Sequence, residues 1–372
     1  MKGTAFLELD TPALLVDLDR MEHNLRFMQE KATLAGVRLR PHVKTHRTPA
    51  IAKIQEAMGA TGITVAKLGE AEVMASEGLD DIFIANEIVG PVKLERLKRL
   101  LKRVRRLAVG VDDPVHVEML SRAMEGEPFS LDVLIDIETG DPRTGIHPGA
   151  PALELARRVA GASGLHLRGI YTHDGQSYDA ETIEEVREIN RQSQERMLET
   201  ADLLRRAGIP VEEISIGSTP SLLVDGIERG ITEIRPGTYI FLDADQAQLI
   251  GTTAFCAQTV LATVISRPTP ERVVLDAGTK SLTYYVQEKG VTRAIGHGRL
   301  KDHPEIFLDR MSDEHSSFDI PPSSGLEFSI GDKLEIIPNH ACPTTNLHEF
   351  IHGIRNGKVE VTWPVLCQGK SQ

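Results

Sequence analysis

A lysine flanked by an arginine and two histidines could act as a nucleophile in the first part of the chain. Lys44 lies in the segment 40–46, Arg-Pro-His-Val-Lys-Thr-His. Positive charge on Arg40, His42 and His46 would disfavour the ammonium form of the lysine, and a Schiff base with a carbonyl compound requires the neutral amine. The alternative interpretation is a basic turn at the surface, where lysine is common.

A turn of small residues follows the apolar run 214–216. Gly217 would let the backbone approach an anion closely, and the hydroxyls of Ser218 and Thr219, with nearby N–H groups, could hold a phosphate. The same serine and threonine would also serve as a helix N-cap. The two interpretations are compatible.

Two further loops place polar side chains behind apolar runs. Arg143 lies in the glycine-bounded segment 138–145 and could contact an acidic group of a cofactor. Tyr171 and His173 follow the next apolar run and offer stacking and acid–base chemistry. The plain alternatives are a solvated arginine and a structural histidine.

A histidine and a cysteine lie two residues apart near the end of the chain. On an extended segment His340 and Cys342 face the same side, and both are good ligands for a divalent ion such as Zn²⁺. Two ligands do not complete a site. A dry structural pair and an open catalytic site with water or substrate as further ligands therefore remain alternatives.

Short apolar runs alternate with amphipathic stretches from residue 11 to about residue 245. Strand followed by helix, repeated about eight times, predicts a TIM-type (β/α)₈ barrel, in which polar residues after the strands gather at one end. The runs assigned to strands are 13–16, 63–66, 81–85, 107–110, 131–137, 167–171, 214–216 and 234–235.

The pattern changes after residue 245, where β-branched runs are separated by Pro- and Gly-rich turns with almost no helical periodicity. This sequence pattern predicts a second, mostly β domain. We therefore expect an N-terminal strand within 1–10 that joins the C-terminal domain, a barrel over 11–245 and a β domain over 246–372.

Composition agrees with two folded domains and excludes several partners. The 372 residues exceed the ~250–300 at which a single core stops growing. The net charge of −12 disfavours binding to nucleic acid or anionic membranes, and no run approaches the ~18 apolar residues of a membrane span. Three scattered cysteines do not form a disulfide framework and favour a reducing, cytoplasmic location.

Taken together, the sequence resembles the fold-type III pyridoxal 5′-phosphate (PLP) enzymes. These have an alanine-racemase-like N-terminal barrel, and the resemblance is greatest to the D-threonine aldolase and D-serine dehydratase group. It covers nearly the whole chain, and the ordered set of motifs is far more specific than any one of them. The segments that carry it are 10–13, 40–46, 68–72, 171–175, 217–220, 235–239, 275–280, 314–315 and 338–343.

The resemblance implies a role for most of these residues. Lys44 would bind PLP, Arg143 and Tyr171 would lie near it, and His173 is the first candidate for a base. The residues implied in holding the phosphate are Gly217, Ser218, Thr219, Gly237, Thr238 and Tyr239. One departure is Ala66-Lys67, where many relatives carry a glutamine that could contact the cofactor.

A divalent metal, Zn²⁺ or Mn²⁺, on His340 and Cys342 is also implied. The family is usually homodimeric, with the β domain of one subunit closing the active site of the other. The implied activity is cleavage of D-threonine and related D-3-hydroxy amino acids to glycine and an aldehyde. This aldolase chemistry is favoured because segments 172–175 and 235–241 are closer to that branch.

Four alternatives remain. A D-serine dehydratase-type ammonia-lyase is favoured by Cys342, and a 3-hydroxy-D-aspartate aldolase belongs to the same group. A racemase would need a second base opposite Lys44, for which Tyr284 and Tyr285 are available. A non-catalytic PLP-binding protein generally lacks a second β domain, so this chain does not fit that class well.

Overall fold

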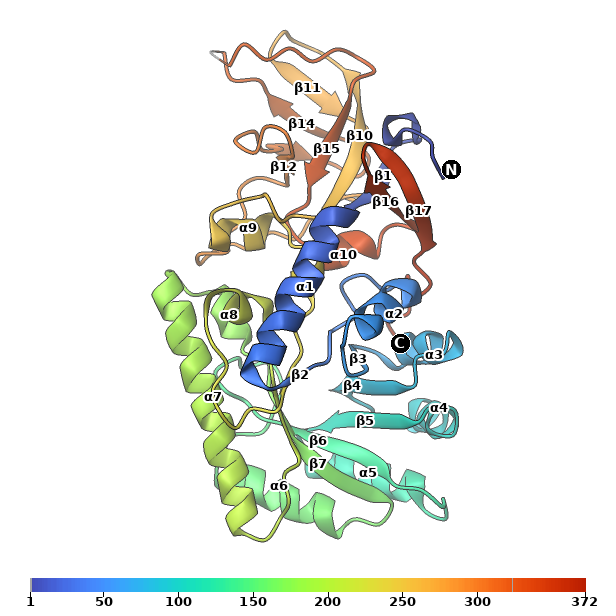
Figure 1. Cartoon of the computed structure of the whole chain (residues 1–372), viewed down its shortest axis with the longest axis vertical. Coiled ribbons are helices and arrows are strands. Elements are labelled where there is room, and N and C mark those ends of the chain that lie inside the picture. The colour runs from blue at the N-terminus through green and yellow to red at the C-terminus, as the bar shows by residue number, and fades with distance from the viewer. Residues whose placement is uncertain (1, 323) are drawn as a thin grey trace.

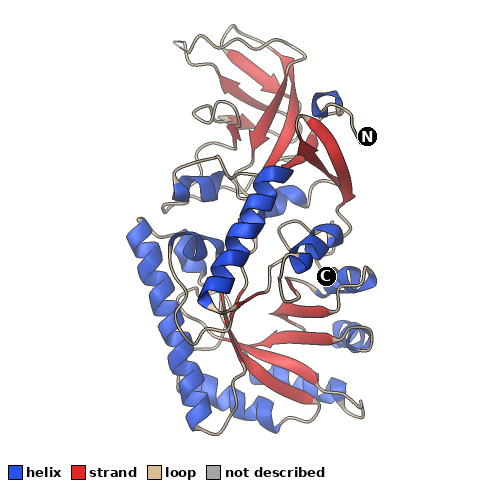
Figure 2. Ribbon diagram, in the orientation of Figure 1, coloured by secondary structure: helices blue, strands red, loops and turns tan. Residues whose placement is uncertain are grey.

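The computed structural model describes residues 2–322 and 324–372 and has two parts (Figure 1). An α/β barrel fills the lower half of the view, a β domain the upper half, and helix α1 runs between them. Figure 2 shows helices flanking the barrel sheet, whereas strands dominate the other part. The described residues contain no helix long and apolar enough to span a membrane.

Eight parallel strands form the barrel sheet, in the order β2-β9-β8-β7-β6-β5-β4-β3. Its two edges meet where Thr64 N donates to Pro41 O at 2.8 Å and Val43 N donates to Thr64 O at 2.9 Å. The prediction of a (β/α)₈ barrel is confirmed. The strands are β2 (Arg38–Leu39), β3 (Ile63–Val65), β4 (Asp81–Glu87), β5 (Arg106–Val111), β6 (Leu131–Asp136), β7 (Leu165–Tyr171), β8 (Glu213–Ile216) and β9 (Glu233–Ile234).

Helices follow the barrel strands, and several begin with proline, whose missing N–H costs nothing in the first turn. They bury apolar residues at three- and four-residue spacing, as Leu155, Ala156 and Val159 do in α6. The helices are α2 (Pro49–Ala57), α3 (Leu68–Ser76), α4 (Pro91–Leu101), α5 (Pro114–Met124), α6 (Ala150–Gly161), α7 (Ile183–Arg206) and α8 (Thr219–Val224), with 3₁₀ turns at Gly175–Tyr178 and Thr238–Ile240.

The second sheet has nine strands, and its main path is β13-β14-β11-β10-β1-β16-β17. Its strands are β1 (Ala13–Asp17), β10 (Gln258–Ser266), β11 (Arg272–Leu275), β12 (Arg299–Leu300), β13 (Arg310–Met311), β14 (Ser316–Asp319), β15 (Lys333–Ile337), β16 (Phe350–Arg355) and β17 (Lys358–Pro364). Helices α1 (Leu18–Ala35), α9 (Ala244–Ile250) and α10 (Ala341–Thr345) lie where this part meets the barrel.

The assignment of run 13–16 to the barrel is wrong, because β1 pairs with β10 and β16 in the second sheet. Residues 38–39 form the remaining barrel strand. A strand that precedes a helix has the same apolar sequence pattern in either sheet, so the local pattern could not show to which sheet this strand belongs. Residues 6–8 form a 3₁₀ helix instead of a strand, and Ala5 makes a single antiparallel bridge to Lys358 of the β domain.

A buried ion pair lies at the amino ends of the barrel strands. The guanidinium of Arg40 donates to Asp81, which begins β4, at 2.6 Å and to Glu233, which begins β9, at 2.9 Å. All three side chains are almost completely buried. Arg40 therefore neutralises two carboxylates on the side of the barrel opposite to the carboxyl ends of the strands.

Replacing this arginine should destabilise the protein strongly. Arg40→Met would remove the buried cation of Asp81 and Glu233 and leave these carboxylates only the more exposed guanidinium groups of Arg105, Arg106 and Arg38. We therefore expect the apparent free energy of unfolding in urea to fall by about 3 kcal/mol, the lower end of the cost of breaking a buried pair. The control is Arg105→Met, because Arg105 also pairs with Asp81 but is 59% exposed. That variant should lose less than about 1 kcal/mol. Equal losses would show that the Arg40 pair contributes no more than a surface pair.

Candidate active site

A cavity of about 300 Å³ opens at the carboxyl ends of the barrel strands. It brings together residues that are far apart in the sequence. The predicted site residues that line it are Lys44, Arg143, Tyr171, His173, Gly217, Ser218, Thr219, Gly237 and Thr238. The further polar residues that line it, which had no predicted role in the site, are Asn86, Glu87, Asp136, Thr144, Tyr178 and Arg235.

Lys44 lies in the loop between β2 and α2, enclosed by protein. Burial lowers the pKa of its ammonium group, and the charges of Arg143 and Arg235 lower it further, while Cys342 and Glu70 act in the opposite direction. The amine is thus favoured, as the sequence predicted. The predicted cause is wrong, because Arg40 is neutralised at the other end of the barrel.

The two histidines beside Lys44 do not carry the positive charge that the sequence predicted. Burial lowers the pKa of His46 to about 4 and lowers that of His42 as well. Both rings are therefore neutral at pH 7. His46 Nε2 lies 3.1 Å from Gln55 Oε1, which makes it a structural histidine of the loop.

Arg47 ties the Lys44 loop to the β domain. Its Nη1 donates to Asn346 Oδ1 at 2.8 Å, just after α10, and to Cys367 O at 3.1 Å. Its Nη2 lies 3.2 Å from the buried carboxylate of Glu70 in α3. These contacts hold the loop between the barrel and the chain segment after β17.

The turn after β8 lines the cavity and packs closely against neighbouring segments. Gly217 has a φ of +147°, and a Cβ at this position would lie 2.9 Å from Arg235 N. A Cβ at Gly237 would similarly lie 3.0 Å from Thr45 Oγ1. Both glycines therefore allow backbone segments to approach each other, and the first N–H groups of α8, beginning at Thr219, have no acceptor within the helix.

His173 contacts this turn directly. Its Nδ1 lies 2.9 Å from Gly217 O and donates to it, so a neutral ring leaves Nε2 with a free lone pair. Burial lowers the pKa of His173 to about 3, and Lys44 and Arg143 contribute in the same direction. The ring is therefore neutral at pH 7.

Tyr171 forms one wall of the cavity, and its position depends on a glycine. Its ring packs edge-on against Phe83, with ring centroids 5.0 Å apart, and the Arg235 guanidinium lies 5.1 Å from its centroid. A Cβ at Gly110 of β5 would lie only 2.2 Å from Tyr171 Oη. Only glycine at position 110 leaves space for this tyrosine.

Gly110→Ala should therefore displace the Tyr171 ring. We expect a loss of about 1–3 kcal/mol in unfolding free energy from overpacking, together with a weaker affinity for PLP. Adding Tyr171→Phe removes the nearest oxygen and should recover part of the stability. Gly161→Ala is the control, since a Cβ there meets nothing within 4 Å. The explanation fails if the two glycine variants behave alike.

His340 and Cys342 lie beside the Lys44 loop of the same chain. Cys342 Sγ is 3.2 Å from Thr45 Oγ1 and 3.5 Å from Thr238 Oγ1. Burial opposes ionisation of the thiol, but His340 and Lys44 outweigh it and lower the pKa of Cys342 to about 7. Burial lowers the pKa of His340, but Cys342 and Asp243 outweigh it and raise that pKa above its ordinary value. A divalent ion that displaced this proton would meet a thiolate and an imidazole, which are a suitable donor set for a borderline-soft ion.

A carboxylate orients the imidazole. His340 Nδ1 lies 3.3 Å from Asp243 Oδ2, which leaves Nε2 for a ligand, as is usual for histidines that bind metal. Within residues 2–322 and 324–372 no group of three or more His, Cys, Asp or Glu side chains is arranged to hold a metal ion. An ion bound by His340 and Cys342 would therefore need further ligands of another kind, such as water or a substrate hydroxyl.

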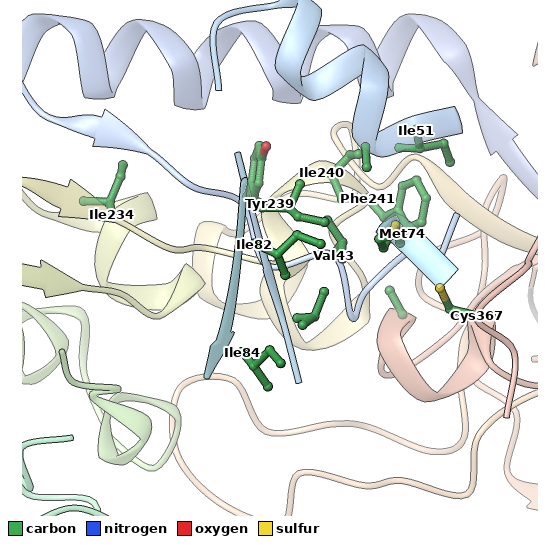
Figure 3. Close-up of a cluster of buried hydrophobic side chains, with 14 of the residues drawn as sticks. Val43, Ile51, Met74, Ile82, Ile84, Ile234, Tyr239, Ile240, Phe241 and Cys367 are labelled. Atoms are coloured by element: carbon green, nitrogen blue, oxygen red, sulfur yellow. The ribbon is translucent and has the colours of Figure 1, made fainter. Parts of the chain in front are cut away.

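Three tyrosines considered from the sequence lie outside the cavity lining. Tyr239 packs among apolar side chains such as Val43 (Figure 3), and its Oη accepts a hydrogen bond from Gln55 Nε2 at 2.9 Å. Its side chain is therefore part of the core, and the predicted role of the turn from Gly237 to Tyr239 in holding a phosphate would involve the backbone of this residue and not its ring. Tyr285 donates to Gln287 and packs against the His340 ring, and Tyr284 stacks on His297, so neither lines the cavity around Lys44 within one chain.

Several lining residues were missed although a signal for them existed. Asn86 and Glu87 come directly after the apolar run 81–85, and Asp136 lies at the end of β6. Polar residues at such positions are candidates in any barrel. Burial raises the pKa of Asp136 to about 6, and Thr144 Oγ1 donates to it at 2.9 Å.

Comparison with known proteins agrees with this architecture. Residues 16–245 match the family model "Alanine racemase, N-terminal domain", and residues 257–354 match a serine dehydratase domain model. Barrel and β domain together define a fold-type III PLP-dependent enzyme. A solved alanine racemase from Bacillus anthracis, 18% identical with a TM-score of 0.65 over 96% of this chain and 98% of that chain, shares the fold.

Closer relatives narrow the family. D-threonine aldolase from Arthrobacter sp is 36% identical over 100% of this chain and 96% of its own. The crystal structure of D-threonine aldolase from Filomicrobium marinum has a TM-score of 0.91 and 36% identity, covering 100% of this chain and 99% of that chain. The chain belongs to the family of D-threonine aldolase and related PLP-dependent lyases.

A dehydratase is almost as similar. D-threo-3-hydroxyaspartate dehydratase from Delftia sp. (strain HT23) is 34% identical over 91% of this chain and 92% of its own. Its solved structure has a TM-score of 0.89 and 31% identity, covering 98% of this chain and 99% of that chain. Solved variants of a D-threo-3-hydroxyaspartate dehydratase replace a histidine and, two residues further on, a cysteine by alanine, and the cysteine variant is described as being in the metal-free form.

Proposed function

We propose that this chain is a PLP- and divalent-metal-dependent aldolase that cleaves D-threonine and related D-3-hydroxy amino acids to glycine and an aldehyde. The observation that carries the proposal is 36% identity to a D-threonine aldolase over the whole chain. The cavity supports it, because a lysine, a histidine and a His-Cys pair lie at or beside the same barrel end.

The lining residues fit PLP. Gly217, Ser218 and Thr219 would hold the phosphate with Gly237 and Thr238, since all five residues line the cavity. Lys44 would supply the amine that binds the aldehyde, and Arg143 and Tyr171 would border the ring. When bound, PLP withdraws electrons from the substrate Cα, which stabilises the carbanion left by bond cleavage.

The remaining chemistry falls to side chains of this chain. His173 Nε2 would accept the proton of the substrate β-hydroxyl, because the neutral ring keeps its lone pair free. The Cα–Cβ bond then breaks, the β-carbon leaves as an aldehyde, and the electron pair remains on Cα. Lys44 Nζ, which lines the same cavity, would return a proton to Cα, which yields glycine. A divalent ion on His340 and Cys342 would lower the pKa of the hydroxyl.

A dehydratase is the second candidate, and one observation favours it. His340 and Cys342 have the two-residue spacing of the histidine and cysteine replaced in the solved variants of D-threo-3-hydroxyaspartate dehydratase. In this reaction Lys44 would remove the α-proton and the β-hydroxyl would leave. D-Threonine would then yield 2-oxobutanoate and ammonia.

One assay separates the two candidates. With D-threonine, PLP and Mn²⁺ or Zn²⁺, we expect glycine and acetaldehyde in equal amounts and less than about a tenth as much 2-oxobutanoate, with no turnover of L-threonine. Products are measured by chromatography and by reduction of the aldehyde with alcohol dehydrogenase. 2-Oxobutanoate and ammonia as main products would establish the dehydratase instead. No turnover of D-threonine or D-3-hydroxyaspartate would overturn both.

A homodimer and a cytoplasmic location remain predictions. The His340–Cys342 pair meets the Lys44 loop within one chain, since Cys342 lies 3.2 Å from Thr45. The metal pair of the proposed site therefore does not depend on a second subunit. Light scattering of the purified protein measures the oligomeric state.

A further inference from the structure

A chain of buried hydroxyl groups leads from the cavity wall to a carboxylate. Ser218, which lines the cavity, donates through Oγ to Ser221 Oγ at 3.1 Å, and Ser221 donates to Asp174 Oδ2. Ser177 Oγ lies 3.1 Å from Ser218 Oγ on another side. All four side chains belong to residues that are at most 3% exposed.

The direction of these hydrogen bonds depends on one proton. An ionised Asp174 can only accept, so Ser221 points its hydrogen at the carboxylate and keeps its oxygen as an acceptor, to which Ser218 donates in this structure. Ser218 then offers the cavity only lone pairs, which repel an anion. A protonated Asp174 can donate to Ser221, Ser221 can donate to Ser218, and the hydrogen of Ser218 becomes free to point into the cavity.

We propose that Asp174 is a positioning residue that sets the direction of the Ser218 hydroxyl, so that Ser218 donates to a bound phosphate or similar dianion only while Asp174 is protonated. The proposal rests on the proposed function, in which the turn at Gly217 to Thr219 holds the phosphate of PLP. Asp174 acts through Ser221 and does not touch the ligand.

The charges around Asp174 allow this switch near neutral pH. Burial raises the pKa of Asp174 to about 6, although the hydrogen bond from Ser221, the nearby Ser218 hydroxyl and the charge of Arg235 oppose the rise. The neighbouring His173 is neutral, because burial lowers its pKa to about 3. Tyr178, which also faces Asp174, is neutral as well, since burial raises its pKa. An anion in the cavity would raise the pKa of Asp174 further, and binding would therefore take up a proton.

Sulfate is the probe, because it remains a dianion across the range in which phosphate itself titrates. Its dissociation constant is measured on the cofactor-free protein by competition with PLP absorbance at about pH 6 and pH 8. From pH 6 to pH 8 the sulfate affinity of the wild type should fall by a factor roughly tenfold larger than that of Ser221→Ala, in which the row of hydroxyl groups is interrupted. Asp174→Asn, which cannot titrate, should also lose this extra pH dependence.

Ser177→Ala is the matched control. Ser177 and Ser221 are both buried serines whose Oγ lies 3.1 Å from Ser218 Oγ, but only Ser221 links Ser218 to Asp174. Ser177→Ala should therefore keep the wild-type pH dependence. Asp136 and Cys342 also titrate in this range and are unchanged in every variant, so they cannot produce a difference between the two serine variants.

The outcomes separate this proposal from the proposed function. A steep wild-type profile that Ser221→Ala and Asp174→Asn flatten and Ser177→Ala retains would support it. PLP binding with the same sulfate profile in all four proteins would overturn the role of Asp174 alone. If wild-type protein binds neither PLP nor sulfate, the proposed function and this inference fall together. PLP absorbance of each variant near pH 6 confirms that it is folded.

Discussion

Alanine in place of Lys44 should reduce turnover of D-threonine on the order of 10³-fold or more and remove covalently attached PLP. The reason is that the Lys44 loop places the only lysine side chain lining the described cavity. Borohydride reduction of the wild-type protein, followed by peptide mass spectrometry, should find the pyridoxyl group on Lys44. An adduct on another lysine would overturn the assignment.

The control for Lys44 is Lys53→Ala. Lys53 lies exposed in α2, the helix that follows the Lys44 loop, so its removal should leave the adduct and turnover within about twofold of wild type. If Lys53→Ala and Lys44→Ala lose activity equally, the loss reflects disturbance of this region and not the Lys44 amine.

Stability measurements distinguish a lost amine from a lost fold. The pKa of Lys44 is below its ordinary value of 10.5 in the folded protein, so between these two values the unfolded chain binds more protons. Wild-type stability therefore rises with pH across that window. The free energy of unfolding of cofactor-free Lys44→Ala should exceed that of the wild type most at pH values below this window. The difference should shrink as the pH approaches 10.5, and urea unfolding measures it.

The second large effect concerns the metal pair. Cys342→Ala removes a thiol whose pKa is lowered to about 7, and with it one of the two proposed ligands. We expect metal affinity to fall by about 10²-fold or more and aldolase turnover to fall with it, since metal ligands dominate such sites. Metal affinity is measured by competition with a chromophoric chelator, and EDTA treatment of the wild type should reproduce the loss of activity.

Cys256→Ala controls for the loss of a buried thiol near the same helices. Burial raises the pKa of Cys256, and its Sγ donates to Asp243 O at 3.4 Å, so it remains protonated. This variant should keep wild-type metal affinity. Full activity of Cys342→Ala, or of the wild type after EDTA, would mean that the His340–Cys342 pair is structural.

The fold class could be predicted from the sequence because its determinants are local. Alternating apolar runs and amphipathic stretches indicated strands and helices, and their number indicated a barrel. Run 13–16 was assigned to the wrong sheet for the same reason: β1 is apolar and precedes a helix, as a barrel strand does. Strand pairing depends on distant residues such as those of β10 and β16, which no local pattern identifies.

The site around Lys44 likewise has features that the sequence determines and features that depend on the tertiary structure. The residue types at 40–46, 217–219 and 340–342 determined by themselves which reactions the chain could support. An amine can form a Schiff base, a hydroxyl can bind a phosphate, and an imidazole and a thiolate can bind a metal ion. Only the tertiary structure decided which groups meet. It turned Arg40 toward Asp81 and Glu233, buried Tyr239 in the core and brought Cys342 to the Lys44 loop. Burial and long-range charge, which set the pKa of Lys44, arise only from that packing.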